Sequence, residues 1–320
     1  MNNHKVLMPQ VIQPEGLAYL KEHGYEYVIG RGVSEDEIIA DIADCDALIV
    51  RTAKITRRII ESAPKLKVIA RHGAGYDGVD IEAAKERGIL VLTAGPANAV
   101  SVAEVAVFYM LYCARNFRAI QEHYVQDYKY AKTKIRKTEL NGKTLGLIGV
   151  GNIGSLVAKK AALGFDMKVL AYDPFFKGTV PEYMQLVDDR DTVFKESDYV
   201  SLHVPALPST IHSVGAREFS LMKPTAYLIN TSRGTVVDEP ALIEALKNHE
   251  IAGAGLDVLE KEPMDQDNPL LAMENVVTAP HIGGMTVEAS ARSSVACAEG
   301  IDDFFNGIRP KFVIPEMRNM

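Results

Sequence analysis

The 320-residue sequence lacks the features that mark membrane, secreted and nucleic-acid-binding proteins. It contains no apolar run that approaches the roughly 20 residues needed to span a bilayer. Its N-terminus lacks the apolar stretch and cleavage site of a signal peptide. Its formal net charge is −7, and the densest basic run, residues 129–137, is short and mixed with Tyr and Thr. We therefore expect a soluble, cytoplasmic protein that binds neither membrane nor nucleic acid.

Cysteine is scarce as well. Cys45, Cys113 and Cys297 lie far apart, are odd in number and include no C-x-x-C pair. This usage fits a reducing compartment and gives no metal site, so we expect no metal. The sequence also has no internal repeat, low-complexity tract or flexible linker, and its length suits two closely joined domains.

Strand-like and amphipathic stretches alternate along most of the chain. Such alternation predicts parallel sheets with helices on both faces, the doubly wound α/β class. In the first series we expect strands at residues 6–8, 25–29, 47–50, 67–70 and 89–92, with helices at 14–23, 35–43, 56–63 and 81–87. In the second series we expect strands at residues 144–148, 168–172, 199–203, 226–230, 252–256 and 276–279.

The pattern changes between and after these two series. Residues 97–114 are typical of a long apolar helix, whereas residues 115–140 are polar and rich in Tyr. We interpret residues 115–140 as a helix and an extended arm, on the surface or at a subunit interface. A last helix is expected at residues 286–305, followed by a strand-like segment at residues 312–315.

The most informative segment is the glycine-rich turn Gly149-Val-Gly-Asn-Ile-Gly154. A buried strand precedes it, a helix at residues 155–163 follows it, and the next strand ends on Asp173. This is the context of the dinucleotide-binding motif, G-x-G-x-x-G with an acidic residue about twenty positions further on. A structural turn that happens to contain three glycines is the alternative, but the complete strand–helix–strand–Asp pattern favours a cofactor site.

Each residue of this motif has a physical task. Gly149 permits the tight turn, Gly151 leaves room for the pyrophosphate, and Gly154 lets the helix pack closely on the strand. The amides and the positive end of the helix N-terminus then face the phosphates. Asp173 accepts hydrogen bonds from the adenosine ribose hydroxyls and repels a 2′-phosphate, so the predicted cofactor is NAD rather than NADP.

Three further residues follow predicted strands in the second half of the chain: Arg233, Glu262 and His281. Doubly wound sheets bind ligands at the carboxyl ends of their parallel strands. Taken singly, the three are read as a surface arginine, a loop carboxylate and a packed histidine. Together they permit hydride transfer to a carbonyl, because His281 can donate a proton to the developing alkoxide. Glu262 then favours the protonated imidazole, and Arg233 binds a carboxylate and polarises the ketone.

With these residues identified, the chain resembles the D-isomer-specific 2-hydroxyacid dehydrogenases over nearly its whole length. The motifs that carry the resemblance are Gly149-x-Gly-x-x-Gly154, Leu202-His-Val-Pro205, Asn230-Thr-Ser-Arg-Gly234, Asp257-Val-Leu-x-x-Glu-Pro263 and Pro280-His-Ile-Gly-Gly284. The resemblance implies an NAD-dependent oxidoreductase whose catalytic residues are Arg233, Glu262 and His281. It also implies that the cofactor is contacted by Gly149, Gly151, Asn152, Ile153, Gly154, Asp173, His203, Pro205, Thr210, Thr231 and Asp257.

The fold that the resemblance implies is discontinuous. Residues 1–97 and 290–320 form a flavodoxin-like substrate domain, and residues 98–289 form an inserted Rossmann NAD domain, with the cleft between the two. Members of the family are usually homodimers joined through the NAD domain, which fits an interface role for residues 115–140.

The substrate is expected to be a small 2-hydroxy or 2-keto acid. The resemblance places its carboxylate on the backbone amides of the loop Gly73–Gly75. Arg51 and Arg71 stand where the phosphoglycerate dehydrogenase branch contacts the substrate phosphate, and two guanidinium groups suit a doubly charged phosphate. We therefore predict the pair 3-phosphoglycerate and 3-phosphohydroxypyruvate. The predicted substrate-binding residues are Arg51, Arg71, His72, Gly73, Ala74 and Gly75.

Other functions stay open. His72 replaces the small apolar residue expected beside Arg71. We also expect a short form without the regulatory domain of many phosphoglycerate dehydrogenases. Hydroxypyruvate, glyoxylate or another polar keto acid is therefore an alternative substrate. Arg51 has the alternative of pairing with an acidic residue at the sheet edge. In a different class, the fold also serves NAD-sensing corepressors, which do not need the complete set of Arg, Glu and His. A formate-oxidising relative is expected to have Gln where this chain has Glu262.

Overall fold

The structure, a computed structural model, describes residues 4–319 and divides into two compact units. The first unit contains residues 4–98 and 284–319, and the second contains residues 99–283. The second unit is therefore an insertion into the first. No helix among residues 4–319 is both long and apolar enough to cross a bilayer.

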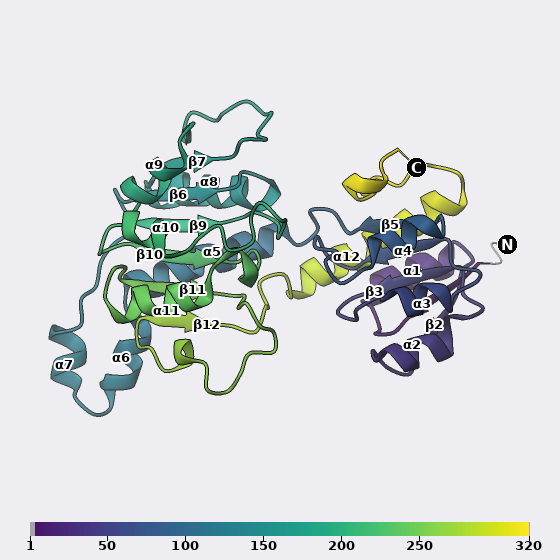
Figure 1. Ribbon diagram of the computed structural model, residues 1–320, viewed down its shortest axis with the longest axis horizontal. Coiled ribbons are helices and arrows are strands. Elements are labelled where there is room, and N and C mark those ends of the chain that lie inside the picture. The colour runs from purple at the N-terminus through teal and green to yellow at the C-terminus, as the bar shows by residue number, and fades with distance from the viewer. Residues whose placement is uncertain (1–3, 320) are drawn as a thin grey trace. The chain divides into compact units, whose positions relative to one another are not determined.

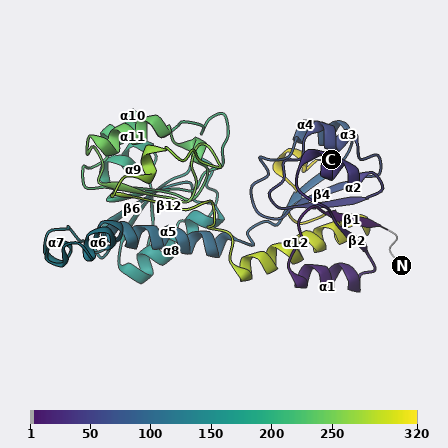
Figure 2. The same ribbon diagram turned by 90° about the horizontal axis from the view of Figure 1, so that it is seen from below.

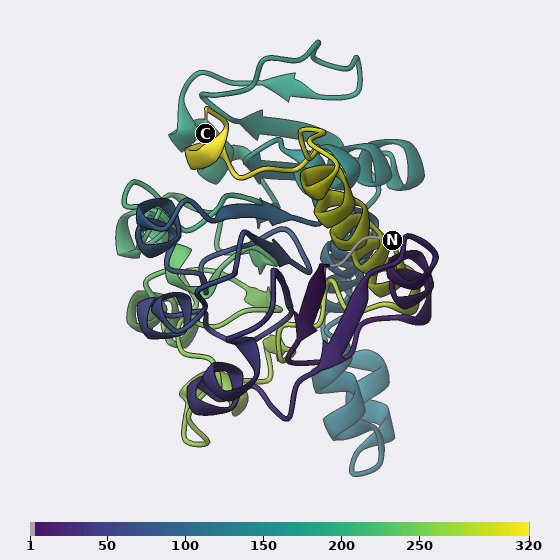
Figure 3. The same ribbon diagram turned by 90° about the vertical axis from the view of Figure 1, so that its right-hand side faces the viewer.

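The first unit is built on a five-stranded parallel sheet in the order β2-β1-β3-β4-β5, the order of flavodoxin-like folds. Helices α2, α3 and α4 cover one face, and α1 and α12 cover the other (Figure 2). Figure 3 shows the yellow α12 packed alongside α1. The elements are β1 (Lys5–Met8), α1 (Pro14–Glu22), β2 (Glu26–Ile29), α2 (Glu35–Ile42), β3 (Ala47–Val50), α3 (Arg57–Glu61), β4 (Val68–Arg71), α4 (Ile81–Glu86), β5 (Leu90–Thr93), α12 (Val287–Phe305) and the short 3₁₀ helix η3 (Pro315–Met317).

The second unit is built on a seven-stranded parallel sheet in the order β12-β11-β10-β9-β6-β7-β8, so the strand order reverses at β6 as in Rossmann folds (Figure 1). Helices α9, α10 and α11 cover one face, and α5 and α8 cover the other (Figure 2). The elements are α5 (Ala99–Ala114), α6 (Phe117–Tyr124), α7 (Tyr128–Thr133), β6 (Thr144–Ile148), α8 (Asn152–Phe165), β7 (Lys168–Tyr172), β8 (Gln185–Leu186), α9 (Arg190–Glu196), β9 (Tyr199–Leu202), α10 (Ala216–Leu221), β10 (Tyr227–Asn230), η1 (Gly234–Val236), α11 (Glu239–Lys247), β11 (Gly253–Leu256), η2 (Pro269–Leu271) and β12 (Val276–Thr278).

Helices cover both faces of each sheet, so the central strands are buried and apolar. Every residue of β3 and of β10 is buried. Strands covered on both faces must be continuously apolar, and this is the pattern that the sequence carries. The predicted fold, a Rossmann domain inserted into a flavodoxin-like domain with two doubly wound parallel sheets, is confirmed.

Two local predictions were wrong. The extended arm expected within residues 115–140 contains a second helix, α7, because the side chain of Asp127 accepts a hydrogen bond from the Tyr130 amide and caps it. Residues 312–315 form one antiparallel bridge, between Val313 and Leu92, instead of a strand. Pro315 has no amide hydrogen to extend that pairing along the edge strand β5.

Candidate active site

The glycine-rich turn follows β6 and leads directly into α8. Gly149 has φ 95°, a conformation that suits glycine, and a Cβ there would lie 2.7 Å from the His203 carbonyl oxygen. A Cβ on Gly154 would overlap the Gly149 carbonyl, so helix and turn pack too closely for any larger residue. A Cβ on Gly151 would meet nothing within 4 Å, which leaves open space in front of the helix N-terminus.

Asp173 lies just beyond β7, and its carboxylate is held beside the turn. One oxygen accepts the Val150 amide at 2.8 Å and the other accepts the Phe175 amide at 2.9 Å. The adjacent N-terminus of α8 offers amides without intrahelical acceptors. Asn152 is exposed and Ile153 is half-buried at this helix start.

Three buried polar atoms in the second unit have no hydrogen-bond partner among residues 4–319: Oγ of Ser197, Oγ1 of Thr231 and Nδ1 of His203. Thr231 and His203 directly follow β10 and β9, at the carboxyl ends of these strands, whereas Ser197 precedes β9. His203 Nε2 lies 2.9 Å from Ser201 Oγ, and burial lowers the pKa of His203 to about 3. Unsatisfied buried polar atoms are costly, so such atoms at a ligand edge fit contact with a bound group. Together with the open space at Gly151, they fit a dinucleotide. The Thr210 hydroxyl, by contrast, is used within its own turn, where it donates to the Pro205 carbonyl at 2.5 Å.

Arg233 is carried by the turn after β10, and buried Asn230 shapes that turn. The Asn230 Oδ1 atom accepts hydrogen bonds from the Ser232 amide and hydroxyl, and its Nδ2 donates to the Arg233 carbonyl at 2.9 Å. The Arg233 Nη1 donates to the Ser232 carbonyl at 2.7 Å. The guanidinium is therefore held against a turn whose backbone is fixed by the hydrogen bonds of Asn230.

Glu262 lies on an exposed loop after β11, and this loop rests on the Arg233 turn. A Cβ on Gly234 would overlap the carbonyl group of Leu259, so the two backbones are in direct contact there. The Glu262 Oε1 atom accepts the Leu259 amide at 3.2 Å. The loops that carry Arg233 and Glu262 thus pack against one another at Gly234 and Leu259, which are close in sequence to these two residues.

His281 contacts Glu262 through its Nδ1 atom, which lies 2.9 Å from Glu262 Oε2. His281 has φ 54°, in the left-handed region that non-glycine residues rarely adopt and that clusters at functional sites. Asp257, which is buried, holds this turn. Its carboxylate accepts the Ile282 amide at 2.9 Å and the Gly283 amide at 2.8 Å, and its carbonyl accepts the His281 amide.

The charges around Glu262 favour its ionised form. Partial burial alone would raise the pKa of Glu262, but the hydrogen bond and charge of His281, the Leu259 amide and the charge of Arg233 outweigh it and lower that pKa. The carboxylate is therefore an acceptor at neutral pH, and the shared hydrogen lies on His281 Nδ1. The Nε2 atom of His281 takes no part in this contact.

The predicted substrate-binding residues lie together in the first unit, at the ends of β3 and β4. Arg51 donates to the Val11 carbonyl at 2.9 Å, and it forms no ion pair with residues 4–319, so the acidic partner considered for it is not observed. The Arg71 guanidinium contacts the His72 carbonyl. Gly73 is buried with φ 148°, Ala74 is exposed and Gly75 is half-buried.

His72 is turned into the fold. Its Nε2 atom lies 2.9 Å from Ser294 Oγ and 3.2 Å from the Ser290 carbonyl, both on α12. Burial and the charge of Arg51 lower the pKa of His72 to about 4, so its ring is neutral at pH 7. His72 therefore adds no positive charge to Arg51 and Arg71.

A comparison with protein families identifies the chain. The model of the NAD-binding domain of D-isomer specific 2-hydroxyacid dehydrogenases matches residues 107–283, more than half of the chain. The chain belongs to the D-isomer specific 2-hydroxyacid dehydrogenase family. The resemblance inferred from the five motifs is thus confirmed.

Similar proteins include relatives named as a dehydrogenase and a reductase of 2-hydroxy or 2-keto acids, and a solved structure. A D-3-phosphoglycerate dehydrogenase of Methanocaldococcus jannaschii is 41% identical over 95% of this chain, which spans 58% of the relative. A hydroxypyruvate reductase of Thermotoga maritima is 42% identical over 94% of this chain and 98% of its own length. The crystal structure of the TT0316 protein of Thermus thermophilus superposes with a TM-score of 0.88 at 32% identity, covering 97% of this chain and 99% of that one.

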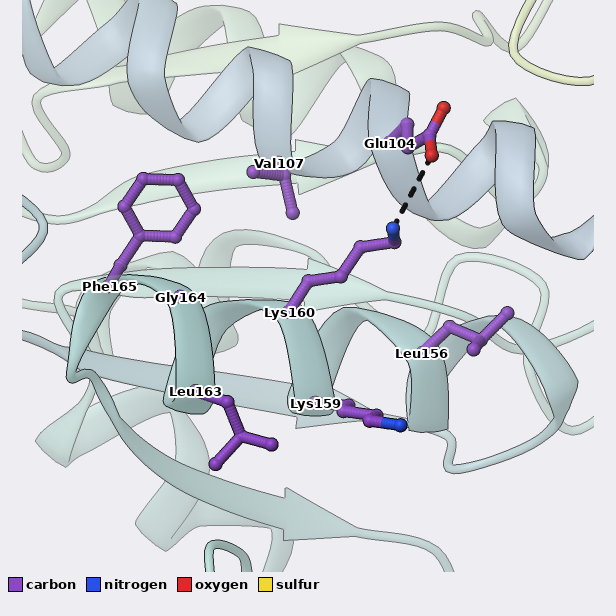
Figure 4. A pocket seen from close by; sticks show the side chains of 8 residues that line it. All are labelled: Glu104, Val107, Leu156, Lys159, Lys160, Leu163, Gly164 and Phe165. Atoms are coloured by element: carbon purple, nitrogen blue, oxygen red, sulfur yellow. Dashed lines mark hydrogen bonds and ion pairs between the residues drawn. The ribbon is translucent and has the colours of Figure 1, made fainter.

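One cavity of this family member lies apart from the residues above. It has a volume of about 600 Å³ and lies between α5 and α8 (Figure 4). Its lining is mainly apolar, with Val107, Leu156 and Leu163, and an ion pair of 3.4 Å joins Lys160 to Glu104. Because none of the predicted catalytic, cofactor or substrate residues lines it, we do not assign it to the active site.

Proposed function

We propose that the chain catalyses the NAD-dependent interconversion of a 2-hydroxy acid and its 2-keto acid. The observation that carries the proposal is the 2.9 Å contact between His281 Nδ1 and Glu262 Oε2, beside the tethered Arg233. A carboxylate–imidazole pair of this kind gives a proton donor with a fixed tautomer. A site that only sensed a dinucleotide would have no need of that pair.

The cofactor is expected to be held by the turn Gly149–Gly154, by Asp173, and by two atoms without a partner among residues 4–319, Thr231 Oγ1 and His203 Nδ1. When bound, NADH supplies the hydride that reduces C2 of the keto acid. The carboxylate of Asp173 accepts ribose hydroxyls and disfavours a 2′-phosphate, which supports NAD over NADP. Equal turnover with NADH and NADPH would contradict this preference.

His281 supplies the proton. In the direction of reduction, its Nε2–H protonates the oxygen that becomes the hydroxyl, while its Nδ1–H continues to donate a hydrogen bond to the Glu262 carboxylate. In the direction of oxidation, the neutral Nε2 accepts that proton. Glu262, which stays ionised, stabilises the imidazolium formed in this step.

Arg233 binds the substrate. Its guanidinium suits the carboxylate of a 2-keto acid and polarises the adjacent carbonyl, where negative charge develops during reduction. The Asn230 and Ser232 contacts fix the turn before substrate binds, so less ordering remains for the binding step.

The substrate that we propose is 3-phosphohydroxypyruvate, with 3-phosphoglycerate as its reduced partner. Two arginines, Arg51 and Arg71, lie at adjacent strand ends and suit a doubly charged phosphate. The 41% identity to a phosphoglycerate dehydrogenase supports the same substrate. A hydroxypyruvate reductase that matches this chain over 98% of its own length supports unphosphorylated hydroxypyruvate as the second candidate.

The test is the initial rate of NADH oxidation with 3-phosphohydroxypyruvate and, in parallel, with hydroxypyruvate. We expect a preference for the phosphorylated acid on the order of 100-fold in kcat/KM, which corresponds to ~2.7 kcal/mol. Equal or inverted rates would assign Arg51 and Arg71 to the scaffold and favour a general keto-acid reductase. No oxidation with either acid would contradict both substrates, and NADH binding without turnover of any keto acid would favour a sensor.

We also propose that the chain forms a homodimer through its second unit. Apolar and aromatic side chains are exposed along α5, α6 and α7, among them Phe108, Val125 and Tyr128. Exposed apolar surface gathered in this way is typical of protein interfaces. Sedimentation velocity should give about twice the mass of the chain, and Val125→Glu should shift the protein toward monomer; a monomeric wild type would refute the proposal.

A further inference from the structure

The loop that carries Glu262 has few contacts of its own with the core. All residues from 261 to 267 are exposed, while the residues at its two ends, Glu260 and Asn268, are half-buried. An exposed loop of this length has many conformations unless its ends are held. The geometry of Glu262 therefore depends on what fixes Glu260 and Asn268.

Both ends are fixed by one side chain, that of Glu239 at the first turn of α11. Its Oε2 accepts the Glu260 amide at 3.0 Å, and its Oε1 accepts Nδ2 of Asn268 at 2.7 Å. The Glu239 amide in turn donates to Glu260 Oε2 at 3.3 Å. The other oxygen of Glu260 contacts His212 Nε2 at 2.7 Å. One carboxylate thus ties the start of the loop to its end.

We propose that Glu239 is a positioning residue, which fixes the place of Glu262, and through it of His281, by holding both ends of the loop 260–268. Its effect on turnover rests on the function proposed above. Its effect on the loop does not, because the contacts exist in the protein without substrate.

The donors and acceptors in this contact are specified unambiguously. Asn268 Oδ1 accepts the Leu270 amide at 3.0 Å, so its Nδ2 must face Glu239. The Glu260 backbone offers an N–H. Glu239 therefore meets two donors and needs two acceptor oxygens, which a glutamine cannot supply.

The experiment exchanges the hydrogen-bond donor and acceptor between positions 239 and 268. Glu239→Gln places an NH₂ group against a donor, and Asn268→Asp places two carboxylates face to face. The double variant Glu239→Gln/Asn268→Asp restores the pattern, because the new amide donates to Asp at 268 and still accepts the Glu260 amide. Glu244→Gln, on the same helix and with Lys247 as its side-chain partner, is the matched control.

We expect each single variant to lower kcat by about 10- to 100-fold at saturating NADH and keto acid, with KM for NADH little changed. The double variant should recover most of the lost kcat, and Glu244→Gln should behave as wild type. In hydrogen exchange, the amides of residues 260–268 should exchange faster in both single variants and return to wild-type rates in the double variant. Thermal unfolding checks that all variants fold.

Wild-type exchange rates in Glu239→Gln, or a double variant no better than the worse single one, would overturn the proposal. An inactive wild type would overturn the proposed function instead. In that case the exchange experiment, which needs no turnover, still decides whether Glu239 holds the loop.

Discussion

The Glu262 carboxylate is held on both of its oxygens: Oε2 lies 2.9 Å from His281 Nδ1, and Oε1 accepts the Leu259 amide at 3.2 Å. A carboxylate held in this way cannot rotate without losing one of its partners. The imidazole of His281 is therefore oriented by a carboxylate that is itself fixed, and its Nε2 atom is the one to which we assign the proton transfer.

Replacing His281 by Gln should lower kcat by about 10²- to 10⁴-fold, the usual range for loss of a general acid. NADH binding should be almost unchanged, because the His281 side chain is not among the predicted cofactor contacts. Steady-state rates and NADH fluorescence titration measure the two effects. A variant that turns over normally would assign the proton to another group.

Replacing Arg233 by Ala should abolish measurable turnover and leave NADH affinity nearly intact. Arg233→Lys is the control, since it keeps the charge but loses the planar fork, and we expect it to recover little activity. The same titrations apply. Loss of NADH binding in the Ala variant would mean that Arg233 contacts the cofactor or supports the turn.

Replacing Glu262 by Gln should change how the free energy of unfolding depends on pH. In the folded protein the pKa of Glu262 lies below its ordinary value of 4.5. The ionised carboxylate therefore makes its full contribution to the free energy of unfolding above pH 4.5, and this contribution is lost as the pH falls through the lower pKa of the folded state. Urea unfolding of both proteins at neutral pH and near pH 3 tests this. The difference in unfolding free energy should shrink in acid, and a difference that grows in acid would contradict it.

His72 should make the first unit sensitive to mild acid. The unfolded chain takes up a proton near pH 6.5, whereas burial and the charge of Arg51 hold the folded pKa at about 4. The contribution of neutral His72 to the free energy of unfolding is therefore complete above pH 6.5 and is lost as the pH falls toward 4. Between pH 7 and pH 5, wild type should lose about 2 kcal/mol more unfolding free energy than His72→Gln. Parallel losses in the two proteins would show that the ring is not held neutral.

Replacing Gly234 by Ala should destabilise the protein by about 1–3 kcal/mol, because the new methyl group overlaps the Leu259 carbonyl. It should also lower kcat, since the loop of Glu262 must move. Gly164→Ala is the matched control: its methyl group meets nothing within 4 Å, and a gain of about 0.4–1 kcal/mol is expected. Denaturant midpoints of the two variants should move in opposite directions.

The fold could be predicted because it depends on local patterns. Continuous apolar runs such as Ala47–Val50 identify strands covered on both faces, and the glycine-rich turn that ends at Gly154 identifies the connection between β6 and α8. The errors occurred where local pattern is weak. A single capping residue, Asp127, decides that α7 is a helix, and Pro315 ends the pairing of residues 312–315.

The site could be predicted only in part. Motif order pointed to Arg233, Glu262 and His281, but their roles as substrate-contacting and catalytic residues remain predictions, as do the cofactor and substrate contacts. Glu239 gave no signal, because an acidic residue in the first turn of a helix is ordinary. Its role depends on Glu260 and Asn268, more than twenty positions away, and such pairings are decided only by the tertiary fold.

Asp173 has a consequence for any redesign of coenzyme preference. Its two oxygens already accept the amides of Val150 and Phe175, so the carboxylate that we propose to discriminate between coenzymes also holds the glycine-rich turn. An aliphatic substitution meant to admit a phosphorylated ribose would release the Val150 amide inside the glycine turn. A variant that accepts the other coenzyme therefore needs a polar residue at 173, or a second acceptor for that amide, to keep its turn intact.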